Sequence, residues 1–259
     1  MDRYMKIALL QFDTIWEQKE INLQQVESQI AQLPANVDLV VLPEMFTTGF
    51  TMKPINVAEY EDDFTLRFIQ NICRKYNLAI VGSWVTQSDE HFHNRLYFVF
   101  PDGKYQTYDK RHLFTLAGEE KVYTPGNDKI IVDYKDWKIC PLVCYDLRFP
   151  VFSRIVNENY DLLLYVSSWP DRRMFAWNAL LKARAIENMS YVIGVNRSGT
   201  DPNGVYYSGH SQALDMMGDY LVKPLIDEQI AIVALDKENL KETRSRYAFL
   251  KDADSFIIK

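Results

Sequence analysis

This chain of 259 residues contains few cysteines and histidines, and it lacks long runs of basic or of apolar residues. Its three cysteines are an odd number without CxxC spacing, which argues against a disulfide framework and against a zinc site. The net charge is −6 and no block of about five basic residues occurs, so nucleic acid is not an expected partner. No apolar run approaches the roughly 18 residues that a membrane span needs, so no membrane partner is expected either.

The beginning of the chain shows no sign of a targeting segment. Residues 1–7 lack a long apolar stretch followed by a small-residue cleavage site. Together with cysteines that form no evident pairs, this favours a cytoplasmic, reducing location. With 47% hydrophobic residues and no linker or internal repeat, residues 1–259 are expected to form a single domain with a sizeable core.

Hydrophobic periodicity predicts alternating strands and helices. Short apolar runs predict strands at about 5–12, 38–42, 78–85, 94–100, 104–108, 130–134, 138–144, 162–166, 191–195, 208–214 and 230–235. Apolar residues three and four positions apart predict helices at about 18–33, 62–76, 150–158, 172–188 and 237–246. Strands and helices in this order are typical of a layered α/β fold.

One thiol lies where a predicted strand gives way to a predicted helix. The strand stops at Cys144, and Pro150 is well suited to the first turn of the helix that follows. At such a corner Cys144 would lie near amide N–H groups, which favour a thiolate. The ordinary alternative is a cysteine packed in the core. A base and a cation must therefore be found elsewhere before Cys144 is accepted as a nucleophile.

Two charged residues also follow predicted strands. Glu44 comes just after the strand at 38–42, beside apolar residues such as Met45 that would desolvate its carboxylate and raise its basicity. Lys110 ends the return strand of a hairpin. Each residue taken alone is more often a solvated surface charge. Because strand ends converge at one edge of a layered α/β fold, we expect Glu44, Lys110 and Cys144 to lie together.

A carboxylate, an ammonium and a thiol form a complete set for acyl transfer. Glu44 would remove the proton of Cys144, and Lys110 would stabilise the oxyanion of a tetrahedral intermediate. The backbone N–H of Tyr145 is the natural second oxyanion donor. His112 is an alternative base, although it is equally well explained as a hydrogen-bonded loop histidine.

At these residues the sequence resembles the nitrilase superfamily of carbon–nitrogen hydrolases. Three stretches carry the resemblance: 42–46 (LPEMF), 108–114 (YDKRHLF) and 142–150 (LVCYDLRFP). The resemblance extends from about residue 5 to 235. It implies a four-layer α-β-β-α sandwich.

The same resemblance implies roles for individual residues. Glu44 matches the general base, Lys110 the oxyanion stabiliser and Cys144 the acylated nucleophile. A second glutamate often lies near the pocket in this family, and Glu119 is the better match, with Glu120 left as an alternative. Neither a metal nor an organic cofactor is implied.

The family is commonly dimeric, which implies a homodimer or a higher homo-oligomer here. The segment 150–160 and the C-terminal tail at about 236–259 are the candidates for that contact.

Within the superfamily the chain looks most like the ω-amidases, which hydrolyse the terminal amide of α-ketoglutaramate and α-ketosuccinamate. The similarity lies in residues 144–150, 181–188 (LKARAIEN) and 194–201 (GVNRSGTD), and in Trp169 together with Trp177. The implied partners are therefore a small amide substrate and water, and the implied intermediate is a thioester.

A small dicarboxylic monoamide also needs a cation or amide donors for its distal carboxylate. The available arginines are Arg148, Arg172, Arg173 and Arg197. Arg148 is equally well explained as an ion-pair partner of Asp146. Candidates for the walls of the pocket are Phe46, Trp84 and Trp169, although aromatic residues at such positions more often belong to the core.

Three alternative functions remain at this point. The substrate can be another C–N compound, such as an N-carbamoyl amino acid, another aliphatic amide or a nitrile. The chain can also be a non-catalytic interaction scaffold, although the intact Glu44, Lys110 and Cys144 argue against this. A thiol redox protein that uses Cys140 and Cys144 is disfavoured, because their CxxxC spacing departs from the usual CxxC form.

Overall fold

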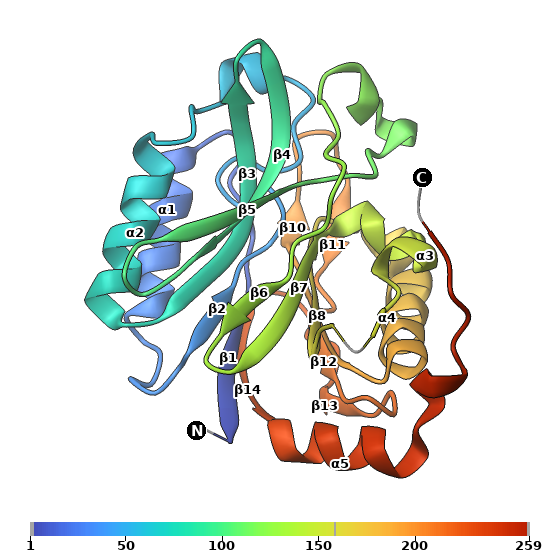
Figure 1. The fold of residues 1–259 in the computed structure, drawn as a ribbon. Coiled ribbons are helices and arrows are strands. Elements are labelled where there is room, and N and C mark those ends of the chain that lie inside the picture. Colours follow the sequence, from blue (N-terminus) through green and yellow to red (C-terminus); the bar gives the residue numbers. More distant parts are fainter. Residues whose placement is uncertain (1–2, 158, 258–259) are drawn as a thin grey trace.

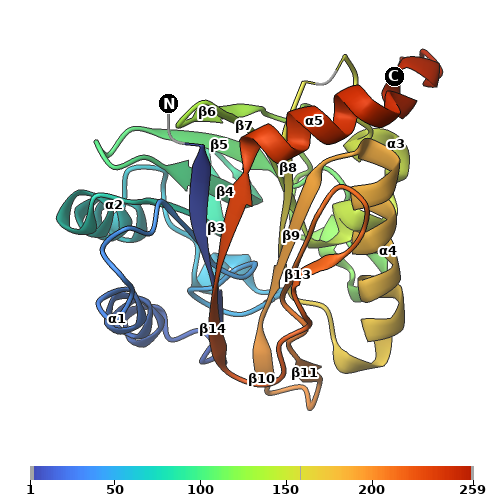
Figure 2. The same ribbon diagram turned by 90° about the horizontal axis from the view of Figure 1, so that it is seen from below.

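Two six-stranded β-sheets pack face to face, and helices cover their outer faces, which gives four layers in the order α-β-β-α (Figures 1 and 2). This computed structural model describes residues 3–157 and 159–257. The arrangement confirms the α/β fold class and the layer order that the sequence implied.

The first sheet has the strand order β14-β1-β2-β3-β4-β5. Strands β1, β2 and β3 are parallel, and β14, β4 and β5 join them through antiparallel pairs. Its strands are β1 (Tyr4–Gln11), β2 (Leu39–Val41), β3 (Ala79–Ser88), β4 (His91–Val99), β5 (Tyr105–Asp109) and β14 (Gln229–Asp236). Helices α1 (Lys19–Ile30) and α2 (Phe64–Tyr76) cover its outer face (Figure 1).

The second sheet has the strand order β13-β12-β9-β8-β7-β6, with β7, β8 and β9 parallel. Its strands are β6 (Val132–Tyr134), β7 (Trp137–Val143), β8 (Leu162–Ser167), β9 (Tyr191–Asn196), β12 (Gln212–Leu214) and β13 (Tyr220–Val222). Helix α4 (Met174–Asn188) and the short α3 (Pro150–Ser153) lie on its outer face, and α5 (Lys237–Tyr247) follows β14 (Figure 2). A separate two-stranded sheet joins β10 (Ser198–Thr200) to β11 (Tyr206–Ser208).

The core lies on both faces of each sheet, as strand periodicity requires. In β2, Leu39 and Val41 pack between the two sheets, whereas Val40 packs toward α1 and α2. Successive side chains of a strand point to opposite faces, so a short run without polar residues can serve two cores at once. Burying each such side chain stabilises the fold by about 1.5–3 kcal/mol.

The loops that follow β2, β7 and β8 meet at one edge of the sandwich. The backbone N–H of Glu44, after β2, donates to the carbonyl of Ser167 at the end of β8, with an N–O distance of 3.4 Å. The hydroxyl of Ser168 donates back to the Glu44 carbonyl at 3.3 Å. Cys144 follows β7 directly. The two sheets are thus tied together at the place where the sequence predicts a site.

One predicted helix is shorter than expected. The sequence predicted a helix over 150–158, but α3 ends at Ser153, and residue 158 lies outside the described residues. Tertiary contacts with the end of α4 explain the difference. The side chain of Arg154 donates to the carbonyl of Glu187, and the backbone N–H of Ile155 donates to Oδ1 of Asn188 at 2.9 Å.

The strand predicted over 208–214 is interrupted. β11 ends at Ser208 and β12 begins at Gln212, because Gly209 and His210 both have positive φ angles, 85° and 65°. No helix in the part of the chain that the structure describes is long and apolar enough to cross a membrane.

Candidate active site

Cys144 lies at a sharp turn between β7 and a short 3₁₀ helix, Cys144–Arg148. Its φ angle is 45°, a left-handed conformation that is uncommon for a residue with a side chain. Such strain persists only where surrounding contacts hold it. Asp146 supplies one of them, because its Oδ2 accepts a hydrogen bond from the backbone N–H of Val143 at 3.0 Å. The turn therefore presents the thiol in a fixed position.

Asp146 is buried and fully engaged in structural contacts. Its Oδ2 also accepts from the hydroxyl of Tyr108 at 2.7 Å, and its Oδ1 lies 2.7 Å from Nδ1 of His112 and 3.1 Å from the backbone nitrogen of His112. The His112 ring stacks on Phe149 with centroids 3.8 Å apart. His112 is thus placed as a hydrogen-bonded loop histidine. The partners of Asp146 are these groups and not Arg148, which corrects the ion pair considered from the sequence.

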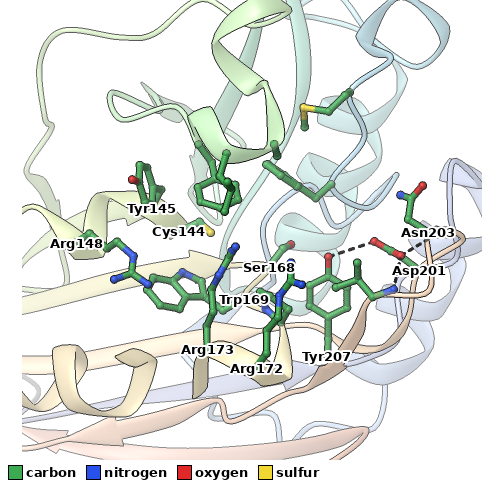
Figure 3. Close-up of a pocket in the computed structure, with 17 residues that line it drawn as sticks. Cys144, Tyr145, Arg148, Ser168, Trp169, Arg172, Arg173, Asp201, Asn203 and Tyr207 are labelled. Carbon is green, nitrogen blue, oxygen red and sulfur yellow. Dashed lines mark hydrogen bonds between the residues drawn. The ribbon is translucent and has the colours of Figure 1, made fainter. Parts of the chain in front are cut away.

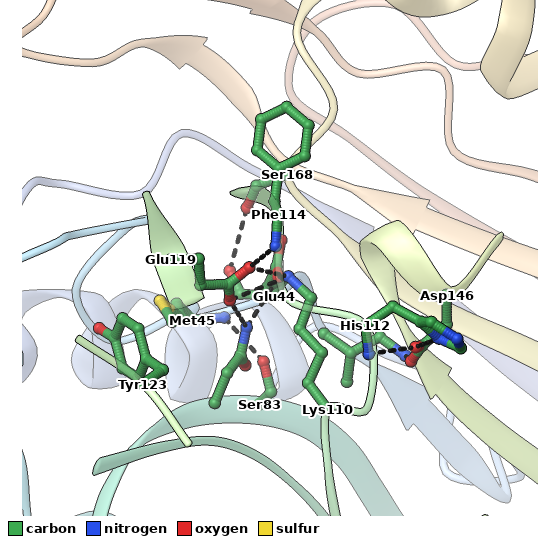
Figure 4. A network of polar contacts seen from close by, with 12 residues as sticks. Glu44, Met45, Ser83, Lys110, His112, Phe114, Glu119, Tyr123, Asp146 and Ser168 are labelled. Atoms are coloured by element: carbon green, nitrogen blue, oxygen red, sulfur yellow. Dashed lines mark hydrogen bonds and ion pairs between the residues drawn. The ribbon is translucent and has the colours of Figure 1, made fainter. Parts of the chain in front are cut away.

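Glu44, Lys110 and Glu119 meet in a single cluster of completely buried charges (Figure 4). The ammonium nitrogen of Lys110 lies 2.8 Å from Oε1 of Glu44 and 2.8 Å and 3.0 Å from the two carboxylate oxygens of Glu119. The residues come from three loops, after β2, after β5 and near residue 119. An ammonium thus lies in direct contact with two carboxylates where water is excluded, so each buried charge has a partner of opposite sign.

The structure distinguishes the two candidate second glutamates. Glu119 is fully buried, and its Oε2 accepts from the backbone N–H of Phe114 at 2.6 Å, whereas Glu120 is exposed. The polar loop at 115–127 contains two short 3₁₀ turns, Thr115–Ala117 and Glu119–Lys121. These turns direct one of two adjacent acids inward and the other into solvent.

The electrostatics of the cluster follow from burial and from these neighbours. Burial alone would lower the pKa of Lys110, but the carboxylates of Glu119 and Glu44 outweigh it and raise that pKa. Burial raises the pKa of Glu119, and Lys110 partly offsets this. The pKa of the Cys144 thiol is raised well above its usual value, first by burial and then by the Glu44 carboxylate, with Lys110 acting in the opposite direction. The resting cluster thus favours a protonated thiol beside an acceptor for its proton.

Cys144 opens into a cavity of about 320 Å³ (Figure 3). Aromatic side chains form much of its wall: Phe50, Phe114, Tyr145, Trp169 and Tyr207. A cavity of this size suits a small organic molecule. Tyr145, whose backbone N–H is the expected second oxyanion donor, and Trp169, expected in the wall, both line it.

Three arginines border the same cavity: Arg148, Arg172 and Arg173 (Figure 3). The Arg148 guanidinium lies 4.8 Å from the ring centre of Trp169, and that of Arg173 lies 4.6 Å from the ring centre of Phe114. Within residues 3–157 and 159–257, no carboxylate forms an ion pair with any of these three. Burial and the charges of Arg172 and Arg148 lower the pKa of Arg173. One carboxylate, that of Asp201, also lines the cavity, and it accepts from the Tyr207 hydroxyl at 3.3 Å and from two backbone N–H groups. The arginines of the wall thus outnumber its carboxylates by three to one.

Other residues proposed for the pocket lie elsewhere. Phe46 and Trp84 belong to the core between the first sheet and its helices, where their rings meet edge-on with centroids 5.9 Å apart. Phe46 is fully buried, and its ring packs closely against Gly82 of β3. Arg197 is buried and paired with Asp13 at 2.8 Å, so its charge is already neutralised. These placements correct the sequence-based assignments of Phe46, Trp84 and Arg197.

Sequence reasoning missed several residues of the site. Asn94, at 1% exposure, donates through Nδ2 to Oε1 of Glu44 at 2.8 Å and to Oε1 of Glu119 at 3.3 Å. Ser168 and Tyr207 line the cavity. The only signal for Asn94 was a polar residue at the head of the predicted strand 94–100, next to a second polar residue, Arg95.

Two histidines, His91 and His93, lie two positions apart in β4. Both imidazoles contact Thr124, His93 at its carbonyl and His91 at its hydroxyl. Among the residues that the structure describes, no group of three or more His, Cys, Asp and Glu side chains is arranged to hold a metal ion.

Comparison with known proteins agrees with this geometry. The sequence matches the carbon-nitrogen hydrolase family over residues 6–245. It is 41% identical to the omega-amidase YafV of Escherichia coli strain K12, over 97% of this chain and 98% of that protein. It is 29% identical to the 2-oxoglutaramate amidase of Bacillus subtilis strain 168, over 95% of this chain and 96% of that protein.

A solved structure is also closely similar. XC1258 from Xanthomonas campestris, described as a CN-hydrolase superfamily protein with an arsenic adduct in its active site, superposes with a TM-score of 0.97. It is 38% identical in sequence, and the match covers 99% of both chains. The chain therefore belongs to the carbon–nitrogen hydrolase family and is an amidase similar to the ω-amidases.

Proposed function

We propose that this amidase hydrolyses the terminal amide of a small dicarboxylic monoamide, such as α-ketoglutaramate or α-ketosuccinamate, through a thioester on Cys144. The observation that carries this proposal is the excess of arginines over carboxylates, three to one, in the wall of the cavity that holds Cys144. The names of two relatives, an omega-amidase and a 2-oxoglutaramate amidase, support the same substrate class.

Acylation begins with a proton transfer. The Cys144 thiol gives its proton to Oε2 of Glu44, a buried oxygen without a hydrogen-bond partner in the described part of the chain, and the sulfur attacks the amide carbon. The resulting oxyanion accepts hydrogen bonds from the Tyr145 backbone and from Lys110. Glu44 then protonates the amide nitrogen, the C–N bond breaks and ammonia leaves.

Deacylation repeats the same steps with water. Glu44 takes a proton from a water molecule, and the hydroxide attacks the thioester carbon while Lys110 and Tyr145 again stabilise the oxyanion. The C–S bond breaks, the proton held by Glu44 returns to the sulfur of Cys144, and the acid departs. No oxidant or second co-substrate is needed.

The substrate class follows from the charge of the cavity. Three guanidiniums repel one another, and a bound carboxylate relieves that repulsion while accepting bidentate hydrogen bonds. Arg173 is the principal candidate, since burial and then the charges of Arg172 and Arg148 lower its pKa, and a carboxylate beside it would offset all three. An anionic end held by these arginines would leave the amide end near Cys144.

The first test is ammonia release from α-ketoglutaramate by the wild type and by Cys144→Ala. Turnover by the wild type alone supports a Cys144-dependent amidase with this substrate. If the wild type hydrolysed only N-carbamoyl amino acids or nitriles, the proposed substrate would be wrong. Full activity of Cys144→Ala would overturn the thioester mechanism.

The role of the arginines is tested by comparing two substrates. Arg173→Met is expected to raise KM for α-ketoglutaramate about 10- to 100-fold, because a charged hydrogen bond contributes about 1.5–3 kcal/mol. A neutral aliphatic amide without a carboxylate should be hydrolysed equally well by both enzymes. Arg67→Met, at an exposed position on α2, is the matched control. Equal losses on both substrates would contradict recognition of the carboxylate.

The proposal includes a homodimer or higher homo-oligomer. Its support is apolar surface on α3 and on the tail beside it, where Val151 and Phe249 are each 56% exposed and border the same hollow. Val151→Glu is expected to lower the molar mass measured by light scattering. An unchanged mass would exclude α3 from the contact.

A reducing compartment such as the cytoplasm suits the proposed thiol chemistry, since Cys73, Cys140 and Cys144 are all unpaired. Fractionation of cells that produce the protein tests this location, and recovery outside the cytoplasm would contradict it.

A further inference from the structure

Asn94 contacts every member of the buried charge cluster. Besides donating to Glu44 and Glu119 through its side chain, it accepts the backbone N–H of Lys110 on its own carbonyl oxygen at 3.0 Å. It lies in β4, whose pairing with β5 places Lys110 directly after the sheet. Asn94 is thus tied to the chain segment that carries the ammonium and to both carboxylates that hold it.

The orientation of the Asn94 amide is costly. Its Oδ1 is buried and has no hydrogen-bond partner within residues 3–157 and 159–257. The opposite orientation would place that oxygen against two carboxylates, which accept hydrogen bonds and do not donate them when ionised. The site therefore retains an unpaired acceptor in order to keep an N–H donor on Glu44 and Glu119.

Lys110 is fully occupied in this arrangement. An ammonium has three N–H bonds, and Lys110 lies within hydrogen-bond distance of three carboxylate oxygens. A substrate oxyanion can receive an N–H from Lys110 only if one of these contacts is released. The longest is the 3.0 Å contact with Oε1 of Glu119. That same oxygen already accepts from Asn94.

We propose that Asn94 is a positioning residue that holds Oε1 of Glu119 while Lys110 turns one N–H toward the oxyanion. Lys110 then keeps Oε1 of Glu44 and Oε2 of Glu119, so both carboxylates remain paired throughout the step. Asn94 itself is not among the residues that line the cavity of Cys144. This inference rests on the thioester mechanism proposed above. It explains how Lys110 can free one N–H for the oxyanion that this mechanism forms.

The test separates steps that form an oxyanion from a step that does not. Asn94→Ala is expected to lower kcat for amide hydrolysis about 10- to 100-fold, less than the loss of an oxyanion donor itself, while KM changes little. Alkylation of Cys144 by iodoacetamide forms no oxyanion, so its rate should stay within about threefold of the wild-type rate. A kcat within about threefold of wild type in folded protein would overturn the proposal. So would a parallel loss of alkylation, since Asn94 would then act on the thiol itself.

A double-mutant comparison tests the stated partner. In a Glu119→Gln background, Asn94→Ala should lower kcat by less than about threefold, because the second charged carboxylate that Asn94 holds is gone. An undiminished effect would overturn the assignment to Glu119.

The matched control is Asn188→Ala in α4. Asn188 is also fully buried and also donates through Nδ2, to the carbonyl of Arg184 at 3.0 Å, but it lies outside the cluster. It should lower stability without separating hydrolysis from alkylation. If Asn188→Ala also lowered the rate of hydrolysis without lowering the rate of alkylation, the effect of Asn94→Ala would be structural and the proposal would be wrong. A wild type that released no ammonia from any amide would instead overturn the proposed function.

Discussion

Two buried polar clusters meet at the short segment from Lys110 to His112, and they differ in how completely their polar atoms are paired (Figure 4). Asp146 accepts from the Tyr108 hydroxyl, from the Val143 backbone, and from both the backbone and the ring of His112. Each carboxylate oxygen of Asp146 thus has two hydrogen-bond partners. This cluster holds the turn at Cys144 and has nothing left to offer a substrate.

The cluster of Glu44, Lys110 and Glu119 is not closed. Oε2 of Glu44 and Oδ1 of Asn94 are buried without hydrogen-bond partners among the described residues. An unpaired buried polar atom costs about 1–3 kcal/mol, so it persists where it has a use. The comparison separates two kinds of buried polar network: a closed one that fixes the backbone and an open one that can exchange protons. Substitutions in the open cluster should lower kcat, whereas substitutions in the closed cluster should lower the free energy of unfolding.

The largest expected effect comes from Glu44→Gln, which removes the proton acceptor and retains the shape. We expect kcat to fall about 10³- to 10⁴-fold, the upper range for a general base. The Glu44 carboxylate raises the pKa of Cys144, so its removal should lower that pKa and increase the thiolate fraction at a given pH. Alkylation of Cys144 should therefore be no slower than in the wild type while hydrolysis is lost. If the two rates fell together, Glu44 would not be the base.

The next effect distinguishes the two adjacent acids of the loop at 115–127. Glu119→Gln weakens the hold on Lys110 and should lower kcat about 10²-fold, close to the loss of one oxyanion donor. Glu120→Gln changes an exposed residue and should leave kcat and stability unchanged. Steady-state rates of the two variants with the same amide make the comparison. Equal losses would mean that the loop acts as a whole and that Glu119 has no separate role.

Much of the fold and the centre of the site could be predicted because strand ends are visible in the sequence. Short apolar runs end at Leu42 and Val143, so Glu44 and Cys144 were expected at the same edge of the sandwich, where the structure places them. Length and periodicity carried this inference, and no knowledge of side-chain directions was needed.

The errors arose where the direction of a side chain matters. Phe46 and Glu44 lie two residues apart in one loop, yet only the loop's conformation decides that Phe46 enters the core. Glu119 and Glu120 could not be told apart from the residues alone, because only the conformation of the 3₁₀ turn Glu119–Lys121 turns the first side chain inward and the second into solvent. Asn94 was missed because its role depends on residues 50 and 25 positions away. Such contacts are set by tertiary structure and leave no local pattern.

A smaller effect is expected from the closed cluster. Asp146→Asn replaces an oxygen that accepts two hydrogen bonds by an NH₂ group, so two donors lose their acceptor. We expect the free energy of unfolding to fall by about 1–3 kcal/mol, measured with urea at equilibrium. Turnover per folded molecule should fall much less than in Glu119→Gln. A large loss of turnover with unchanged stability would place Asp146 in the chemistry and erase the distinction between the clusters.

The smallest effect is expected from His112→Phe. The aromatic ring can keep its stacking on Phe149, while the hydrogen bond from the ring to Asp146 is lost and its other contacts, with Tyr108, Val143 and the backbone of residue 112, remain. A loss of about 0.5–1.5 kcal/mol of stability is therefore expected, which urea unfolding measures, with kcat unchanged within about threefold. The same variant decides whether His112 is a base. A general base contributes about 10²- to 10⁴-fold to the rate, so a loss of that size in stably folded protein would move His112 from the closed cluster into the mechanism.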